Sequence, residues 1–318
     1  MDHSQSDTCP ESRDSEWVAR VRSAASADVR QMLRAERRRK HERWIIGSVA
    51  LVAAVLVLVL LGQIGVSRGS RSPESAPAPS VEAALRQVDP ARPFAGTPAA
   101  DWPDGAAGIQ LPDPVATGGF TAPEVATALA QVRDLLVTSR LDPTLVVRHD
   151  PGRFLAAFAP DARRQLEPLF GSGQEARAQA LVSLVADGTT LLPVAPKVTG
   201  RMRVTAGAQP GELVVHTNYV FVYPFRTDTP AEVDDPMDIL VVVRAQVDYV
   251  LRRGERWTEG SQGWWYDAVA GYAYSIGCDA YRRGFLAPVL TERKTTSPGP
   301  DRAAYFNPDG PLPQASGC

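Results

Sequence analysis

Six polar side chains recur at alternating positions in the last third of the sequence, and their types could do acid–base or hydrogen-bonding chemistry. They are His216, Asn218, Arg244, Gln246, Asp248 and Asp267. Because successive side chains of a β-strand point to opposite faces, we expect all six on one face of a sheet, away from its apolar residues. An acid–base site needs titratable groups in a pocket that excludes water. Three interpretations stay open: an ordinary solvent face, a catalytic site, or a face that docks a partner through His216, Arg244, Gln246, Asp248 and Asp267.

The opposite face of the same strands is predicted to carry the aromatic residues. They are Tyr219, Tyr223, Tyr249, Trp264, Tyr266, Tyr272 and Tyr274. Aromatic rings that line a pocket can stack on a sugar or an apolar ligand. The ligand-binding candidates are Tyr219, Tyr249, Tyr266 and Tyr272. The alternative is that these rings only fill the hydrophobic core.

Motifs for metal, nucleophile or nucleotide chemistry are absent from the sequence. It contains no HExxH, CxxC, GxSxG or phosphate-binding loop. The acidic stretch AEVDDPMD, residues 231–238, lacks the ligand spacing and the glycine of a calcium loop, which favours a solvated turn over a weak cation site. We therefore predict no catalytic residue, no metal site and no cofactor.

The elements that would position these residues change period along the chain. Apolar residues follow helical spacing from Thr121, where Glu124 completes a capping box, and further helices are expected from Asp150 and Ser172. Apolar and polar residues then alternate in four stretches, which are residues 197–206, 212–225, 238–253 and 263–276. Such stretches, joined by short turns, predict an antiparallel meander with the helices packed on one face. The fold class expected for this region is α+β.

The first part of the chain predicts a membrane anchor. Residues 44–66 carry no charge, and a helix of that length spans a hydrocarbon core of about 30 Å. The block RRRKHER, residues 37–43, precedes the run, whereas only Arg68 and Arg71 follow it closely. This asymmetry predicts a transmembrane helix with the N-terminus in the cytoplasm and the rest of the chain outside.

Other interpretations of this region are weaker. A cleaved signal peptide would have a shorter apolar core and fewer residues before it. A lipoprotein would have a cysteine after the run. The basic block is expected to act as a topology and lipid-headgroup signal, with nucleic-acid binding or a cytoplasmic protein partner as alternatives. A formal net charge of −2 gives the whole chain no electrostatic bias toward nucleic acid.

The three cysteines fall on two sides of the predicted membrane. Cys9 is expected inside, and Cys278 and Cys318 outside, where disulfides persist. The stretch that ends in Cys318 is rich in Pro and Gly, and a bridge to Cys278 would hold it on the domain. We predict that bridge, with two free thiols as the alternative.

The order of elements resembles the NTF2-like (cystatin-like cone) fold of bacterial envelope proteins. The resemblance covers roughly residues 120–285 and lies in helices followed by long antiparallel strands behind one anchor. Its relatives include components of conjugation machines, anchored Mce-associated proteins of actinobacteria, and enzymes such as ketosteroid isomerases. Lysine is scarce and arginine abundant, which resembles the coding bias of a GC-rich actinomycete. The resemblance rests on no motif, so it carries over no functional residue.

The expected organisation has five parts. They are a cytoplasmic basic segment 1–43, partly helical; a transmembrane helix 44–66; a Pro/Ala/Gly-rich tether 67–118; an extracytoplasmic α+β domain 119–286; and a C-terminal tail 287–318. We expect a single-pass, non-enzymatic cell-membrane protein that binds other envelope proteins and not nucleic acid, with homo-oligomers left open. The alternative is a ligand-binding or enzymatic NTF2-like domain that uses a tyrosine-lined pocket.

Overall fold

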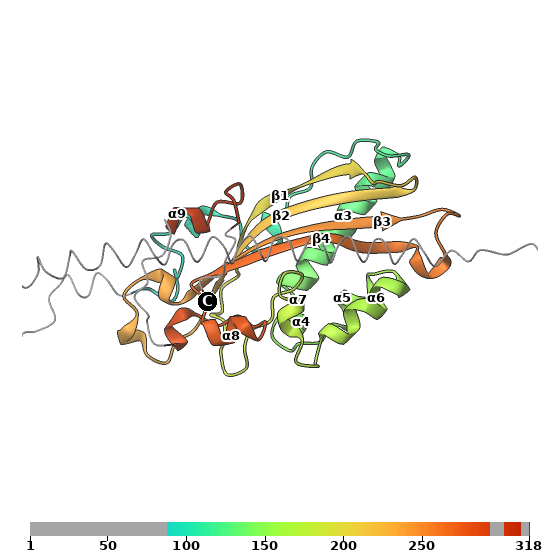
Figure 1. Cartoon of the computed structure of the whole chain (residues 1–318). Coiled ribbons are helices and arrows are strands. Elements are labelled where there is room, and N and C mark those ends of the chain that lie inside the picture. The colour runs from blue at the N-terminus through green and yellow to red at the C-terminus, as the bar shows by residue number, and fades with distance from the viewer. Residues whose placement is uncertain (1–87, 293–301, 313–317) are drawn as a thin grey trace, which may run out of the picture. The chain divides into compact units, whose positions relative to one another are not determined.

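The computed structural model describes residues 88–292, 302–312 and 318 (Figure 1). The chain divides into two compact units, Met1–Ala76 and Pro77–Cys318. The first unit lies wholly outside the described residues. The predictions for the basic segment 1–43, the run 44–66 and most of the tether therefore fall on residues that the structure does not describe.

The centre of the second unit is one antiparallel sheet of four strands in the order β1-β2-β3-β4. The strands are β1 Lys197–Ala206, β2 Glu212–Pro224, β3 Leu240–Arg252 and β4 Gly263–Tyr274. We call the face that carries Tyr219 and Val243 the inner face, and the face that carries Asn218 and Gln246 the outer face. Two-residue alternation along β2 and β3 produces these faces.

Helices cover the inner face. The longest, α3 Ala122–Arg140, begins with the capping box that the sequence predicted: the Thr121 backbone N–H donates to the Glu124 carboxylate at 2.7 Å. Short helices follow: α4 Pro143–Val146, α5 Gly152–Ala156, α6 Pro160–Leu166 and α7 Glu175–Ala178. Buried residues of α3 and of the inner face, such as Leu129, Leu136 and Phe221, belong to one core.

The helix expected from Ser172 is shorter than predicted. Only α7 is helical; residues 181–186 after it are buried and non-helical, with a parallel bridge between Val185 and Leu286. The Leu286 backbone N–H donates to the Leu184 carbonyl at 2.7 Å, and the Ala186 N–H donates to the Leu286 carbonyl at 2.9 Å. An apolar run buried on all sides carries no periodicity, so pairing with a remote segment decides its conformation.

Our fold-class prediction of an N-terminal transmembrane helix joined to an NTF2-like domain is wrong. In residues 88–292 and 302–312, no helix is long and apolar enough to cross a membrane. The described unit is an α+β arrangement, a four-stranded antiparallel sheet with a few helices.

Segments from both ends of the unit cover part of the outer face. They form a second core, whose buried members are Phe94, Ala99, Val220, Val222, Met237, Leu240, Val242, Tyr274 and Phe306. The 3₁₀ turn η2 Gly105–Gly108 lies at the edge of the sheet, so close to β1 that a Cβ on Gly108 would lie 2.3 Å from the Val198 carbonyl oxygen. Parts of the expected tether and tail are thus packed on the sheet, and the compact unit is wider than residues 119–286.

The covering segment from the C-terminal side, residues 302–311, we call the strap. It starts with the short helix α9 Arg302–Tyr305, and the Tyr305 ring stacks on Tyr274 with centroids 4.1 Å apart. Beyond it, Cys318 forms a disulfide with Cys278, the first residue of α8 Cys278–Arg282. The Cα atoms of the two cysteines are 5.1 Å apart.

A β-bulge in β4 changes which face its residues occupy. Val247 pairs with Val269 and Tyr249 pairs with Tyr266, so Asp267 and Ala268 together oppose the single residue Asp248. The extra residue shifts the alternation by one position. Residues of β4 after the bulge therefore lie on the face opposite to the one that a regular strand would give them.

Candidate functional site

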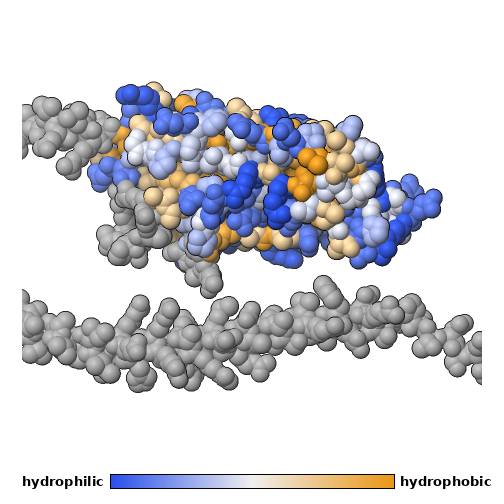
Figure 2. All heavy atoms as spheres, turned by 90° about the horizontal axis from the view of Figure 1, so that it is seen from above, coloured by the Kyte–Doolittle hydropathy of each residue, from blue (hydrophilic) through white to orange (hydrophobic). Residues whose placement is uncertain are grey.

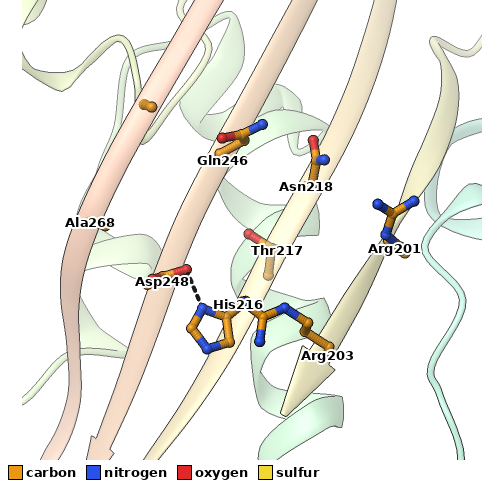
Figure 3. Close-up of a pocket in the computed structure, with 9 residues that line it drawn as sticks. Arg201, Arg203, His216, Thr217, Asn218, Gln246, Asp248 and Ala268 are labelled. Atoms are coloured by element: carbon orange, nitrogen blue, oxygen red, sulfur yellow. Dashed lines mark hydrogen bonds and ion pairs between the residues drawn. The ribbon is translucent and has the colours of Figure 1, made fainter. Parts of the chain in front are cut away.

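The open part of the outer face contains a cavity of about 350 Å³, which we call the outer groove (Figure 3). Its lining residues are Arg201, Arg203, His216, Thr217, Asn218, Gln246, Asp248, Ala268 and Ala270. Each strand contributes to the groove, and Figure 3 shows the helical layer behind the strands, on the inner side. The groove is therefore on the side of the sheet that the helices leave uncovered.

The strand register builds the groove from two rows of neighbouring residues. One row runs Arg203, His216, Asp248 across β1, β2 and β3, and the next runs Arg201, Asn218, Gln246, Ala270 across all four strands. Cross-strand partners project on the same side, with Cβ atoms about 5 Å apart. The β4 members are alanines, whose short side chains leave room for the cavity.

His216 is held on both sides of its ring. Its Nδ1 lies 2.8 Å from Asp248 Oδ1, and its Nε2 lies 2.8 Å from Thr205 Oγ1. Because a carboxylate only accepts hydrogen bonds, Nδ1 must carry the proton, and Nε2 of the neutral ring accepts from the Thr205 hydroxyl. Both nitrogens are thus engaged within the protein. This arrangement orients the imidazole but leaves it no lone pair aimed at a substrate, which a general base would need.

The two arginines of the groove differ in their partners. Arg201 forms an ion pair with Asp309 of the strap, and both side chains remain more than half exposed. Arg203 is exposed, and within the described residues it has no hydrogen bond or ion pair. One cation of the groove is therefore matched by the chain itself, and the next one along β1 faces solvent.

Arg244, which we predicted on the open partner face, is closed off by the strap. Its side chain is 1% exposed. The guanidinium donates to the carbonyl oxygens of Pro308 at 2.8 Å, Gly310 at 2.9 Å and Pro311 at 3.2 Å. Asn218 adds a hydrogen bond from Nδ2 to the Pro308 carbonyl at 2.8 Å. The prediction that Arg244 is available to a partner is wrong, because the strap buries the guanidinium and accepts hydrogen bonds from both of its terminal nitrogens.

Of the other residues predicted for the partner face, the structure brings three into the groove and leaves one out. His216, Gln246 and Asp248 line it. Asp267 does not: it falls in the bulge, is exposed, and Ala268 takes the position beside the groove.

The four tyrosines predicted to bind a ligand do not form a pocket together. Tyr219 and Tyr249 are completely buried in the inner core, and burial raises the pKa of each phenol to about 12. Tyr266 packs edge-on against Phe158, with ring centroids 6.4 Å apart. Tyr272 follows the bulge and pairs with Arg244, so it lies on the outer face, contrary to our prediction.

Sequence reasoning missed a buried arginine in the inner core. Arg140, at the end of α3, is 1% exposed, and burial lowers the pKa of its guanidinium. It donates to Ser183 Oγ at 3.1 Å and to the carbonyls of Gln179 and Ala180. The Tyr223 hydroxyl in turn donates to the Arg140 carbonyl at 2.9 Å. These bonds satisfy a charged core residue with main-chain oxygens, for which the sequence gives no signal.

The acidic stretch 231–238 forms a capped turn. Asp238 accepts hydrogen bonds from the backbone N–H groups of Asp234 and Asp235, and Asp235 accepts one from Met237. Among the residues that the structure describes, no group of three or more His, Cys, Asp or Glu is placed to hold a metal ion. These carboxylates therefore organise the chain before β3.

Comparison with known proteins gives no relative: no family model matches the chain, and neither a curated protein nor a solved structure matches it significantly.

Proposed function

We propose that this domain is a non-enzymatic binding component that docks another protein in its outer groove. One observation carries the proposal: the outer face already binds a polypeptide, because Arg244 and Asn218 hold the strap by its main-chain carbonyls. The groove continues the same face beyond Pro308 and Asp309 of the strap, with Gln246 in the position next to Asn218. A second polypeptide segment would find the same kind of donors there.

The state of His216 and of the tyrosines favours binding over chemistry. Both ring nitrogens of His216 are engaged by Asp248 and Thr205. The alternative of a ligand-binding or enzymatic tyrosine-lined pocket loses its main support, because Tyr219 and Tyr249 fill the inner core. The surface in Figure 2, where hydrophilic residues are interspersed with apolar ones, suits a contact that forms and dissociates.

We further propose that the domain acts outside the cytoplasm at the cell membrane, among other envelope proteins. The disulfide between Cys278 and Cys318 supports an oxidising surrounding. The uncharged run 44–66 behind the basic block 37–43 supports attachment to the membrane with the N-terminus inside. Both sequence segments lie outside the described residues.

Site-specific photo-crosslinking in living cells would test the docking proposal. A photoreactive amino acid replaces Ala268 at the groove, and in a matched variant it replaces Gln165, an exposed residue of α6 on the helical side. We expect a discrete crosslinked protein from position 268 and none from position 165. The proposal fails if neither position gives a crosslink, or if both capture the same proteins.

A further inference from the structure

One arginine of the outer groove already binds a carboxylate of the same chain. Asp309 of the strap pairs with Arg201 at one end of the groove. The two side chains are 55% and 63% exposed, so the pair lies at the rim and not in the core. A carboxylate on a polypeptide segment that packs against this face is thus a ligand that the face accepts.

Arg203 offers a second position of the same kind. It lies two residues after Arg201 on β1, on the same face, and lines the groove. Alternate residues of a strand are about 7 Å apart. An extended peptide has the same spacing between its own alternate side chains. A segment in the groove can therefore place an acidic side chain on Arg203 as the strap places Asp309 on Arg201.

The remaining polar groups decide where in the groove the carboxylate lies. Asp248 also lines the groove, and its negative charge is held beside His216, which disfavours an anion at the β3 side. Gln246 faces the groove from β3, and the described residues supply it with no hydrogen-bond partner. Its amide can donate to a peptide carbonyl, as Asn218 does to Pro308.

From these contacts we infer that the groove recognises an extended, acidic segment of the partner protein, with its carboxylate on Arg203 and its main chain on Gln246. The inference rests on the proposed docking function. Charge complementarity selects the partner: the only cation of the groove without a partner among the described residues is Arg203, and a carboxylate is its natural match.

A peptide-binding experiment on the full-length chain tests this inference. The probe is a fluorescein-labelled peptide in which one serine separates two glutamates, and the comparison peptide has glutamines in their place. At low ionic strength we expect the glutamate peptide to bind about fivefold more tightly, as one well-placed exposed ion pair allows. Inorganic phosphate at the same concentration as the peptide should not displace it, because phosphate makes no main-chain contact.

Two variants locate the effect. Arg203→Gln should abolish the preference for glutamate, whereas Arg256→Gln, the same charge change at an exposed arginine in the β3–β4 connection, should keep it. Asp309→Asn should raise the preference, because it frees Arg201. Equal affinities for the two peptides, equal loss in both arginine variants, or full displacement by phosphate would each overturn the inference. Persistence of the position-268 crosslink in Arg203→Gln would then show that docking stands while carboxylate recognition does not.

Discussion

The two faces of one sheet are closed by different means. The inner face is covered by α3 and the short helices that immediately precede the strands. Its core is mostly apolar, with Arg140 as a buried charged residue at its margin. The outer face is covered only in part, by segments from opposite ends of the unit, around Phe94 and Phe306. There a buried arginine, Arg244, ties the strap down by hydrogen bonds to carbonyls.

This difference explains why one face of the sheet is hydrophobic core and the other carries the candidate site. Helices that follow one another along the chain bury the inner face continuously, so its tyrosines become core residues. Among the described residues, the cover of the outer face reaches as far as Asn218 and Arg201, and the part of the face that they leave uncovered is the groove. The site therefore exists because one of the two covers is incomplete.

The largest expected effect is a loss of stability when a ring is removed from the inner core. Phe221→Ala removes a completely buried ring from the inner face and should lower the free energy of unfolding by about 4 kcal/mol, since the cavity cannot collapse within a packed core. Urea denaturation measures it. Phe306→Ala on the strap is the matched comparison, with a clearly smaller loss. Equal losses would contradict the comparison, because they would show that Phe306 is packed as well as a ring of the inner core.

The second prediction concerns the disulfide that fixes the chain on the C-terminal side of the strap. The double variant Cys278→Ser/Cys318→Ser removes a bridge between residues separated by 40 positions, and the free energy of unfolding should fall by up to about 4 kcal/mol on the chain-entropy account. Urea denaturation with and without a reductant checks it: the reductant should weaken the wild type and leave the double variant unchanged. A double variant as stable as the wild type would contradict a role for the bridge in holding the strap.

The third prediction concerns the hydrogen bonds by which Arg244 holds the strap. Arg244→Met keeps the length of the side chain but removes its hydrogen bonds to Pro308, Gly310 and Pro311, and should cost about 2 kcal/mol. Amide hydrogen exchange should accelerate in the strap and stay unchanged in α3. Arg256→Met is the control, with no change in either. Faster exchange in α3 would show that the two covers are coupled.

The smallest expected effect is a pH-dependent loss of stability at the start of α3, which covers the inner face. The backbone N–H of Thr121, followed by Arg253, lowers the pKa of Glu124 from its ordinary value of 4.5 to about 2. A pKa that folding lowers gives a stabilisation that is complete above pH 4.5 and disappears as the pH falls toward 2. Wild type should therefore exceed Glu124→Gln in stability at neutral pH, by a margin that shrinks across that window. A margin independent of pH would refute the assignment.

Local patterns predicted the regular elements well. Alternation along Leu213, Val215 and Tyr219 located β2 and its inner face, and Thr121 with Glu124 located the start of α3. These signals depend on residues within a few positions of one another. They are therefore visible in the sequence whatever the rest of the chain does.

The strap and the bulge could not be predicted in this way. Arg244 contacts main-chain carbonyls more than sixty residues away, and any sequence has such carbonyls. The bulge at Asp267 and Ala268 adds one residue without changing the composition of the strand, yet it moves Tyr272 to the other face. Four of the nine residues that line the groove were named from the sequence, His216, Asn218, Gln246 and Asp248. Arg201 and Arg203 became relevant only through their register with β2.

The disulfide has a topological consequence for the outer cover. The chain between Cys278 and Cys318 is a closed ring, and the strap is part of that ring. A protease that cuts any one peptide bond inside the ring opens it without separating the pieces, because the sulfur–sulfur bond still joins them. The cut chain would run as one species on a gel until a reductant is added. In an oxidising surrounding such as the one we propose for this domain, a single nick would therefore leave the strap attached beside the groove.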